Sequence, residues 1–304
     1  MRVLVLGAGA LGGYFGGRLL EAGRDVAFLV RPARAEALRR DGLRIESPFG
    51  DVHLRPEVLT EARPGFGAVL LSCKAYDLET AIAAIRPAVE AGAAVLPVLN
   101  GVAHMDGLRE AFGDGAVLGG LARIQATLAP DGTVRHLADW RSLAFGEVAG
   151  GRSPRVAALA GLFDGARGVE AVAAPDIARR MWEKLVHLGT AAIGTVLMRA
   201  RVGDIVRAGG TPFLHEVLAR NAAIAAAHGH PVTEAFLAEY RALFADPLSP
   251  YATSMLRDAE AGRRTEGEHI LGHLARAARA AGVDPGLHDL ALLHVRAHEA
   301  RRTG

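Results

Sequence analysis

The stretch that decides the fold is residues 3–13, VLVLGAGALGG, at the start of a 304-residue chain. Four aliphatic residues at positions 3–6 predict a buried β-strand, and Gly7, Gly9 and Gly12 follow it in the spacing G-x-G-x-x-G. The first glycine of such a motif permits a tight turn, the second lets the backbone approach a pyrophosphate, and the third lets the next helix pack closely. We therefore predict that a dinucleotide binds at a helix N-terminus, to the loop formed by Gly7, Ala8, Gly9, Ala10, Leu11 and Gly12. The alternative is that this loop is a purely structural turn.

Short aliphatic runs alternate with helical patterns through the first half of the chain, as is typical of a parallel sheet with crossover helices. Strands are predicted at residues 25–30, 68–72 and 93–99, a hairpin at 43–54, and helices at about 10–22 and 78–90. Further strand-like runs between residues 117 and 145 predict that antiparallel pairs extend the same sheet.

After about residue 150 the pattern changes to long helical periodicity rich in Ala, Leu and Arg, with almost no strand signal. Helices are predicted to start at Asp176 and to cover about residues 213–227, 233–243, 255–281 with a break near Gly262, and 287–301. We therefore predict an α/β Rossmann-type N-terminal domain, residues 1–168, followed by an all-α C-terminal domain, residues 169–304.

The composition argues against several classes of protein. The single cysteine, Cys73, cannot form an intrachain disulfide, and the N-terminal run is too short for a signal peptide, so a cytoplasmic location is expected. No uninterrupted apolar stretch of roughly 18 residues predicts a membrane span. The net charge is +2, but basic and acidic residues are interspersed, so no nucleic-acid partner is expected.

The residue after the second predicted strand bears on which dinucleotide is bound. An acidic residue there would accept hydrogen bonds from the ribose of NAD, but this chain has Arg31. A guanidinium can bind a 2′-phosphate through charge-assisted hydrogen bonds, so the sequence favours NADP(H), with Arg34 as a candidate to assist. A solvated surface arginine is the alternative.

Lysine is rare in this chain: of the 35 Lys and Arg residues only Lys74 and Lys184 are lysines. An arginine is effectively never deprotonated in a protein, whereas a lysine can give up a proton, so both positions are candidates for chemistry. Chance retention of two surface lysines is the alternative. Lys74 and Asn100 each follow a predicted buried strand, where open parallel sheets place their ligands.

With these residues identified, the chain resembles the ketopantoate reductase family over nearly its whole length. The matching pieces are the glycine loop at residues 7–12, Arg31, Lys74 in Cys73-Lys74-Ala75, Asn100-Gly101, Trp182-Glu183-Lys184-Leu185, Ser254-Met255-Leu256-Arg257-Asp258 and Arg264-Thr265-Glu266. The resemblance implies a helical second domain similar to the C-terminal fold of 6-phosphogluconate dehydrogenase.

The resemblance also implies a role for each matched residue. Lys184 would be the general acid that protonates the carbonyl oxygen as hydride arrives from the nicotinamide. Asn100 would hold that oxygen or the cofactor, with Lys74 beside it at the cofactor. Ser254 and Glu266 would bind the substrate, and Glu266 would also hold the lysine ammonium, which would raise its pKa. These roles fit the chemistry, because hydride addition to a ketone develops negative charge on oxygen and needs a positioned proton donor.

The chain departs from the family pattern on the helix that carries Lys184. The family usually has asparagines four and eight residues after the catalytic lysine, where this chain has Leu188 and Ala192. That helix face is therefore more apolar. His187 lies nearly on the same face and could replace part of the lost hydrogen bonding to substrate, or be a packed core histidine.

The sequence therefore predicts an enzyme that reduces 2-dehydropantoate to pantoate with NADPH. The alternatives are a reductase of the same fold that acts on another small 2-oxo acid, and a non-catalytic NADP(H)-binding sensor. His269 and His273 lie one helical turn apart near Glu266 and Glu268, but their order is not H-E-x-x-H, so no metal is predicted. The Ala- and Leu-rich helical half is compatible with a homodimer.

Overall fold

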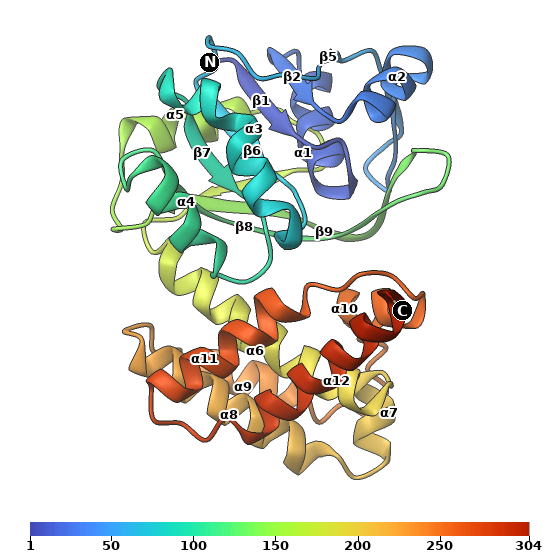
Figure 1. Cartoon of the computed structure of the whole chain (residues 1–304), viewed down its shortest axis with the longest axis vertical. Coiled ribbons are helices and arrows are strands. Elements are labelled where there is room, and N and C mark those ends of the chain that lie inside the picture. The colour runs from blue at the N-terminus through green and yellow to red at the C-terminus, as the bar shows by residue number, and fades with distance from the viewer. Residues whose placement is uncertain (304) are drawn as a thin grey trace. The chain divides into compact units, whose positions relative to one another are not determined.

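The computed structural model describes residues 1–303 and divides the chain into two compact units (Figure 1). The first unit comprises residues 1–99 and 104–178, and the second comprises residues 100–103 and those from 179 onward. The chain passes from the first unit to the second for the last time within helix α6 (Ile177–Met198). The domain boundary after residue 168 stays a prediction.

The first unit is built on a sheet of five parallel strands, as the glycine-loop motif and the aliphatic runs predict. Its strands are β1 (Val3–Leu6), β2 (Val26–Leu29), β5 (Glu57–Leu59), β6 (Ala68–Leu71) and β7 (Ala94–Pro97). The order across the sheet is β5-β2-β1-β6-β7, so the direction of strand addition reverses between β1 and β6. Ligands of open α/β sheets bind at the carboxyl edge beside such a reversal.

Helices form part of the connections between these strands. They include α1 (Ala10–Glu21), α2 (Pro32–Asp41) and α3 (Leu78–Glu90), while α4 (His104–Phe112) follows β7. Strands β2, β6 and β7 are buried at every position, which is why they appear in the sequence as continuous apolar runs. The pattern did not reveal α2, α4 or β5.

A second sheet in the same unit contradicts one prediction. Its strands are β3 (Leu43–Glu46), β4 (Val52–Leu54), β8 (Leu118–Leu128), β9 (Val134–Glu147) and β10 (Glu170–Ala173). The expected antiparallel pairs form, between β3 and β4 and between β8 and β9. However, these pairs belong to a separate sheet and do not extend the first sheet. One isolated bridge, between Val95 and Val117, joins the first sheet to the residue that precedes β8. The short strand β10, which follows helix α5 (Pro154–Leu162), was not expected so late in the chain.

Helix α1 lies between the two sheets, which explains why they stay separate. On one side, a Cβ atom at Gly16 would come within 2.8 Å of Val5 and Phe28, in β1 and β2. On the other side, a Cβ at Gly17 would come within 2.5 Å of Ile45 in β3. Adjacent glycines thus let both sheets approach the helix closely, and the helix is covered on both sides.

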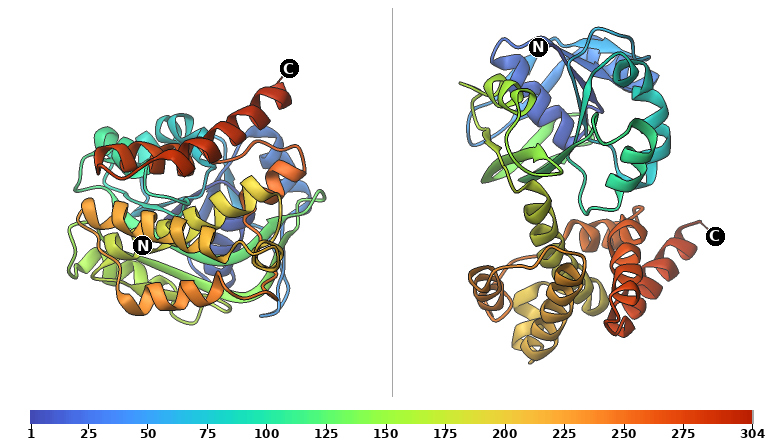
Figure 2. Two further views of the ribbon diagram at one scale, coloured as in Figure 1. Left: turned by 90° about the horizontal axis from the view of Figure 1, so that it is seen from below. Right: turned by 90° about the vertical axis from the view of Figure 1, so that its left-hand side faces the viewer.

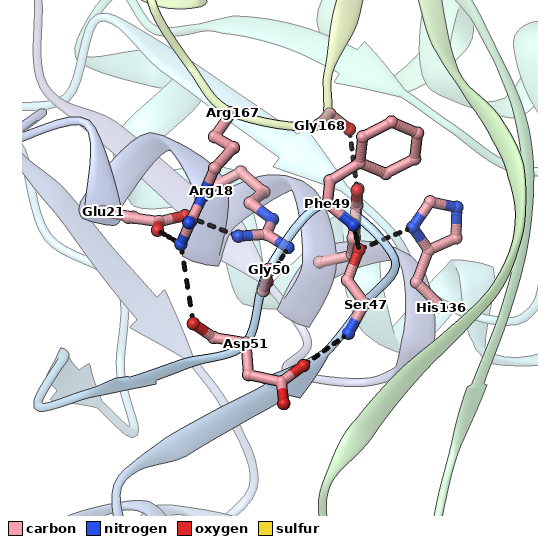
Figure 3. Close-up of polar contacts among 10 residues, drawn as sticks. Arg18, Glu21, Ser47, Phe49, Gly50, Asp51, His136, Arg167 and Gly168 are labelled. Atoms are coloured by element: carbon pink, nitrogen blue, oxygen red, sulfur yellow. Dashed lines mark hydrogen bonds and ion pairs between the residues drawn. The ribbon is translucent and has the colours of Figure 1, made fainter.

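A buried polar network fixes the orientation of α1 (Figure 3). The side chain of Arg18 is fully buried and donates hydrogen bonds to Glu21, at 2.6 Å, and to the carbonyl oxygen of Gly50, at 2.7 Å. The hydroxyl of Tyr14 donates to the carbonyl oxygen of Gly168, at 2.7 Å. The helix that begins at the glycine loop is therefore tied to two loops of the second sheet.

Helices make up all the regular secondary structure described in the second unit (Figure 2). After α6 come α7 (Val202–Arg207), α8 (Thr211–Ala227), α9 (Glu234–Leu243), α10 (Ser254–Glu260), the π-helical turn η2 (Glu268–Gly272), α11 (His273–Ala280) and α12 (Gly286–Thr303). The all-α prediction is confirmed, and the break near Gly262 is a loop between α10 and η2. Within residues 1–303, no helix is both long and apolar enough to cross a membrane.

Candidate active site

The glycine loop has the geometry that phosphate binding requires. Gly7 has a φ of +91°, which favours glycine, and a Cβ on Gly12 would lie only 2.2 Å from the carbonyl oxygen of Gly7 and from the hydroxyl of Ser72. A Cβ on Gly9, by contrast, would meet nothing within 4 Å. The loop is thus closed against the protein at Gly12 and open at Gly9. A pyrophosphate fits this cradle, because the open position adjoins the N-terminus of α1.

The two arginines near the loop have different partners. The side chain of Arg31 is 75% exposed and pairs with the Asp77 carboxylate, with 3.2 Å between nitrogen and oxygen. Arg34 donates hydrogen bonds to the carbonyl oxygens of Ala8, at 3.1 Å, and Gly132, at 3.0 Å. The Arg34 guanidinium therefore supports the glycine loop, and its assistance to Arg31 in phosphate binding stays a prediction.

Lys74 lies at the same edge of the sheet. It is exposed and precedes the short 3₁₀ turn η1 (Ala75–Asp77), which follows β6. Its place at the carboxyl end of a buried strand is the one expected from the sequence, and its contact with a cofactor stays a prediction.

Two further predicted residues contact each other in the second unit, although 84 positions separate them in the chain. The part-buried ammonium of Lys184, on α6, donates a hydrogen bond to Asn100 Oδ1 at 2.9 Å. Asn100 follows the last parallel strand, β7, and the segment 100–103 belongs to the second unit. The contact orients the flexible lysine side chain.

Burial of the Lys184 ammonium lowers its pKa to about 8, against the opposing effect of the Glu266 carboxylate. Glu266 is itself buried and lies just before η2. The sequence predicted only that Glu266 would raise the lysine pKa, since the extent of burial could not be derived from it. Desolvation outweighs the carboxylate and leaves a lysine that can lose its proton near neutral pH.

His269 lies beside Lys184, Asn100 and Glu266 in one polar cluster, although its place in the sequence suggested only a metal ligand. It makes a hydrogen bond with the backbone of Asn100, and its ring lies against Gly101, where a Cβ would be 3.3 Å from the ring. The π-helical turn η2 carries it, and such turns are frequent at functional sites. Within residues 1–303, no group of three or more His, Cys, Asp or Glu side chains could hold a metal ion. The contact of His269 with Asn100 joins residues far apart in the chain, so no local signal in the sequence could have revealed it.

Both units match models of one protein family. Residues 3–150 match the model described as "Ketopantoate reductase PanE/ApbA", and residues 176–299 match "Ketopantoate reductase PanE/ApbA C terminal". This chain belongs to the ketopantoate reductase family. It is therefore an oxidoreductase of a family that acts on CH–OH groups with a nicotinamide cofactor.

Similar proteins match this ketopantoate reductase family member over most of its length. It is 34% identical to "Uncharacterized oxidoreductase YkpB" of Bacillus subtilis, covering 92% of each chain. It is 32% identical to "2-dehydropantoate 2-reductase" of Archaeoglobus fulgidus, covering 98% of each. Among solved structures, 2-dehydropantoate 2-reductase from Methylococcus capsulatus has a TM-score of 0.89 and 30% identity, covering 100% of this chain and 98% of the other.

The remaining candidates of this family member lie in the same helical unit. The ring of His187 stacks on Tyr240, at 4.4 Å between centroids, and on Tyr251, at 5.5 Å, so it is packed among aromatic rings. Ser254 is half-buried at the first position of α10. Their contacts with substrate stay predictions.

Proposed function

We propose that this ketopantoate reductase family member reduces a small 2-oxo acid with NADPH, and that 2-dehydropantoate, reduced to pantoate for pantothenate and coenzyme A biosynthesis, is the leading substrate. The observation that carries the proposal is the Lys184 ammonium, hydrogen-bonded to Asn100 and lowered in pKa to about 8. The names of the Archaeoglobus and Methylococcus relatives support the choice of substrate.

The cluster of Lys184, Asn100 and Glu266 suits the reduction of a ketone. When bound, the dinucleotide supplies the hydride. Lys184 gives its proton to the carbonyl oxygen of the substrate, and Asn100 Oδ1 keeps the ammonium in place for that transfer. Because burial disfavours the charged ammonium, loss of the proton removes the free-energy cost of keeping that charge away from water. Glu266 keeps the lysine protonated until the substrate oxygen becomes basic.

The preference for NADPH rests on Arg31. Its exposed guanidinium follows β2, where a 2′-phosphate attached to the adenosine ribose would bind in a Rossmann domain. The glycine loop would hold the pyrophosphate, with Arg34 supporting the loop through Ala8. Lys74, at the end of β6, is proposed to contact the same cofactor.

A second candidate substrate class is favoured by the α6 face that follows Lys184. Leu188 is half-buried and Ala192 is fully buried, and neither can form a side-chain hydrogen bond with the terminal hydroxyl of ketopantoate. A 2-oxo acid with a purely apolar side chain loses nothing against such a face. His187, next to Leu188 in the chain, and Ser254, at the first position of α10, are the proposed polar contacts to substrate.

Comparison of two nearly identical acids tests the substrate. Purified protein with NADPH would be assayed at 340 nm with ketopantoate and with 3,3-dimethyl-2-oxobutanoate, which lacks only the terminal hydroxyl. Higher kcat/KM for ketopantoate supports the leading substrate. Higher kcat/KM for the deoxy acid reassigns the enzyme to apolar 2-oxo acids, and no turnover of any 2-oxo acid in a wider panel contradicts the proposal.

The Lys184→Ala variant tests the catalytic role. We expect turnover to fall by about 10²- to 10⁴-fold, because the proton donor is lost, while the Kd for NADPH changes less than about threefold. Lys74→Ala is the control, since it removes the other lysine and should weaken cofactor binding instead. A Lys184→Ala protein with unimpaired biological activity would favour a non-catalytic sensor.

A further inference from the structure

The ion pair between Arg31 and Asp77 lies at the carboxyl edge of the parallel sheet. In the register of the sheet, Leu6 at the end of β1 is flanked by Leu29 of β2 and Leu71 of β6. Arg31 follows the first of these neighbours and Asp77 follows the second, so the pair links the two loops on either side of the glycine loop. This edge is where the adenosine of a Rossmann-bound dinucleotide lies.

The Asp77 carboxylate is an unfavourable neighbour for a phosphate. It holds the Arg31 guanidinium at 3.2 Å, and a 2′-phosphate needs that same guanidinium. A phosphate at this place must displace the carboxylate from Arg31 or remain close to its negative charge, and both options cost free energy. The uncharged ribose hydroxyls of NADH have neither cost, because a carboxylate can accept their hydrogen bonds.

The exposure of the pair indicates how large the effect is. The Arg31 side chain is 75% exposed and that of Asp77 is 36% exposed, so solvent screens the interaction. Exposed ion pairs are weak, and the competition therefore moderates phosphate binding without preventing it.

We propose that Asp77 is a specificity-determining residue, which competes with the 2′-phosphate for Arg31 and so narrows the preference for NADPH over NADH. The inference rests on the proposed dinucleotide-dependent function and deepens it. The chain accordingly binds both dinucleotides, with a smaller difference between them than Arg31 alone would produce.

Binding measurements on Asp77→Asn test the proposal without any substrate. Asparagine keeps the shape of the side chain at the start of α3, where the aspartate makes no side-chain capping hydrogen bond, so the fold should be retained. The Kd of NADPH and of NADH would be measured from the change in nucleotide fluorescence. We expect the Kd of NADPH to fall by about three- to fivefold and that of NADH to change less than about twofold.

Two controls separate competition for Arg31 from a general charge effect. Glu79→Gln removes one exposed negative charge two residues away and should change neither Kd by more than about twofold. In a chain that also carries Arg31→Met, Asp77→Asn should lower the Kd of NADPH by less than half the factor seen with Arg31 present, because the guanidinium for which Asp77 competes is absent.

The outcomes distinguish this inference from the proposed function. If both dinucleotides bind and Asp77→Asn leaves the ratio of their Kd values unchanged, the inference is wrong and the proposed function stands. An equal gain from Glu79→Gln also overturns the inference. If neither dinucleotide binds to the unaltered chain, the proposed function fails, and the inference fails with it.

Discussion

At the scale of single residues, two opposing influences act on the Lys184 ammonium. Loss of hydration disfavours the charge, and the nearby Glu266 carboxylate favours it. The balance leaves a pKa of about 8, so the group is mainly protonated at pH 7 and readily gives up its proton. The proton donor proposed here needs this state, and neither influence alone would produce it.

The pH dependence of the two reaction directions follows from that pKa. Reduction requires the ammonium, so kcat/KM for reduction should fall as the pH rises through about 8, whereas oxidation of the hydroxy acid requires the neutral amine and should rise over the same range. Initial rates in both directions between pH 6 and 10 measure this. Rates of reduction that stay level up to pH 10 would contradict the assignment of Lys184 as the donor.

The scarcity of lysine allows the same pKa to be measured directly. Protein labelled with ¹³C at lysine Cε should give two side-chain signals, from Lys74 and Lys184, and Lys74→Arg assigns them. In Glu266→Gln the signal of Lys184 should titrate at a lower pH than in the unaltered chain, because the carboxylate that raises its pKa is gone. An unchanged titration would show that Glu266 does not act on the lysine.

At the scale of elements, the turn from β1 into α1 places two glycines of different function three residues apart. Gly12 is packed against the carbonyl oxygen of Gly7, whereas Gly9 has open space where a side chain would extend. Gly9 also has a φ of −86°, which any residue can adopt. The fold needs Gly12, whereas at Gly9 only the proposed dinucleotide would need a glycine.

Substitution of each glycine by alanine separates the two needs. Gly9→Ala should leave Tm within about 2 °C of the unaltered chain and weaken dinucleotide binding at least tenfold, because the methyl group occupies the space that a pyrophosphate approaches. Gly12→Ala should lower Tm by several degrees, since its Cβ would collide with backbone. Thermal unfolding and nucleotide titration measure both variants. Unimpaired binding by Gly9→Ala would remove the loop from the proposed cofactor site.

At the scale of the whole molecule, stability depends on polar groups buried in the helical unit. His288 of α12 is fully buried and bonds to Asn221 Oδ1 of α8 at 2.7 Å, and Asn221 in turn donates to Thr190 of α6 at 3.0 Å. One chain of hydrogen bonds thus joins three helices that are distant in sequence. Burial lowers the pKa of His288 to about 4, so the ring is neutral in the folded unit.

Acid should therefore destabilise the helical unit over a defined range. Above pH 6.5 the histidine is neutral in both folded and unfolded chains, and between pH 6.5 and about 4 only the unfolded chain takes up the proton, so stability falls, by up to about 3 kcal/mol. Urea unfolding followed by helical circular dichroism measures the loss. His288→Gln, which keeps a side-chain donor but does not titrate, should show a smaller loss in this range; an equal loss would mean that other groups cause it.

Local patterns in the sequence determined much of this protein. Some patterns depend only on neighbouring residues: the glycine spacing after an aliphatic strand, the buried runs of β6 and β7, and the helical periodicity after residue 176. These patterns predicted the α/β and all-α parts of the chain and the positions of most helices. The resemblance to the ketopantoate reductase family, visible in the same motifs, is confirmed by matches over both units.

Only the tertiary structure decided which residues meet and what surrounds them. The separation of the two sheets depends on both faces of α1 being covered, and no local pattern in β8 or β9 records that. The hydrogen bond from Lys184 to Asn100 joins residues 84 positions apart, and the lysine pKa depends on burial by distant segments. Hydration and charge act through space, so the pKa of a side chain depends on the packed chain rather than on the order of its residues. The same is true of the ion pair between Arg31 and Asp77 and of the contact between His269 and Asn100.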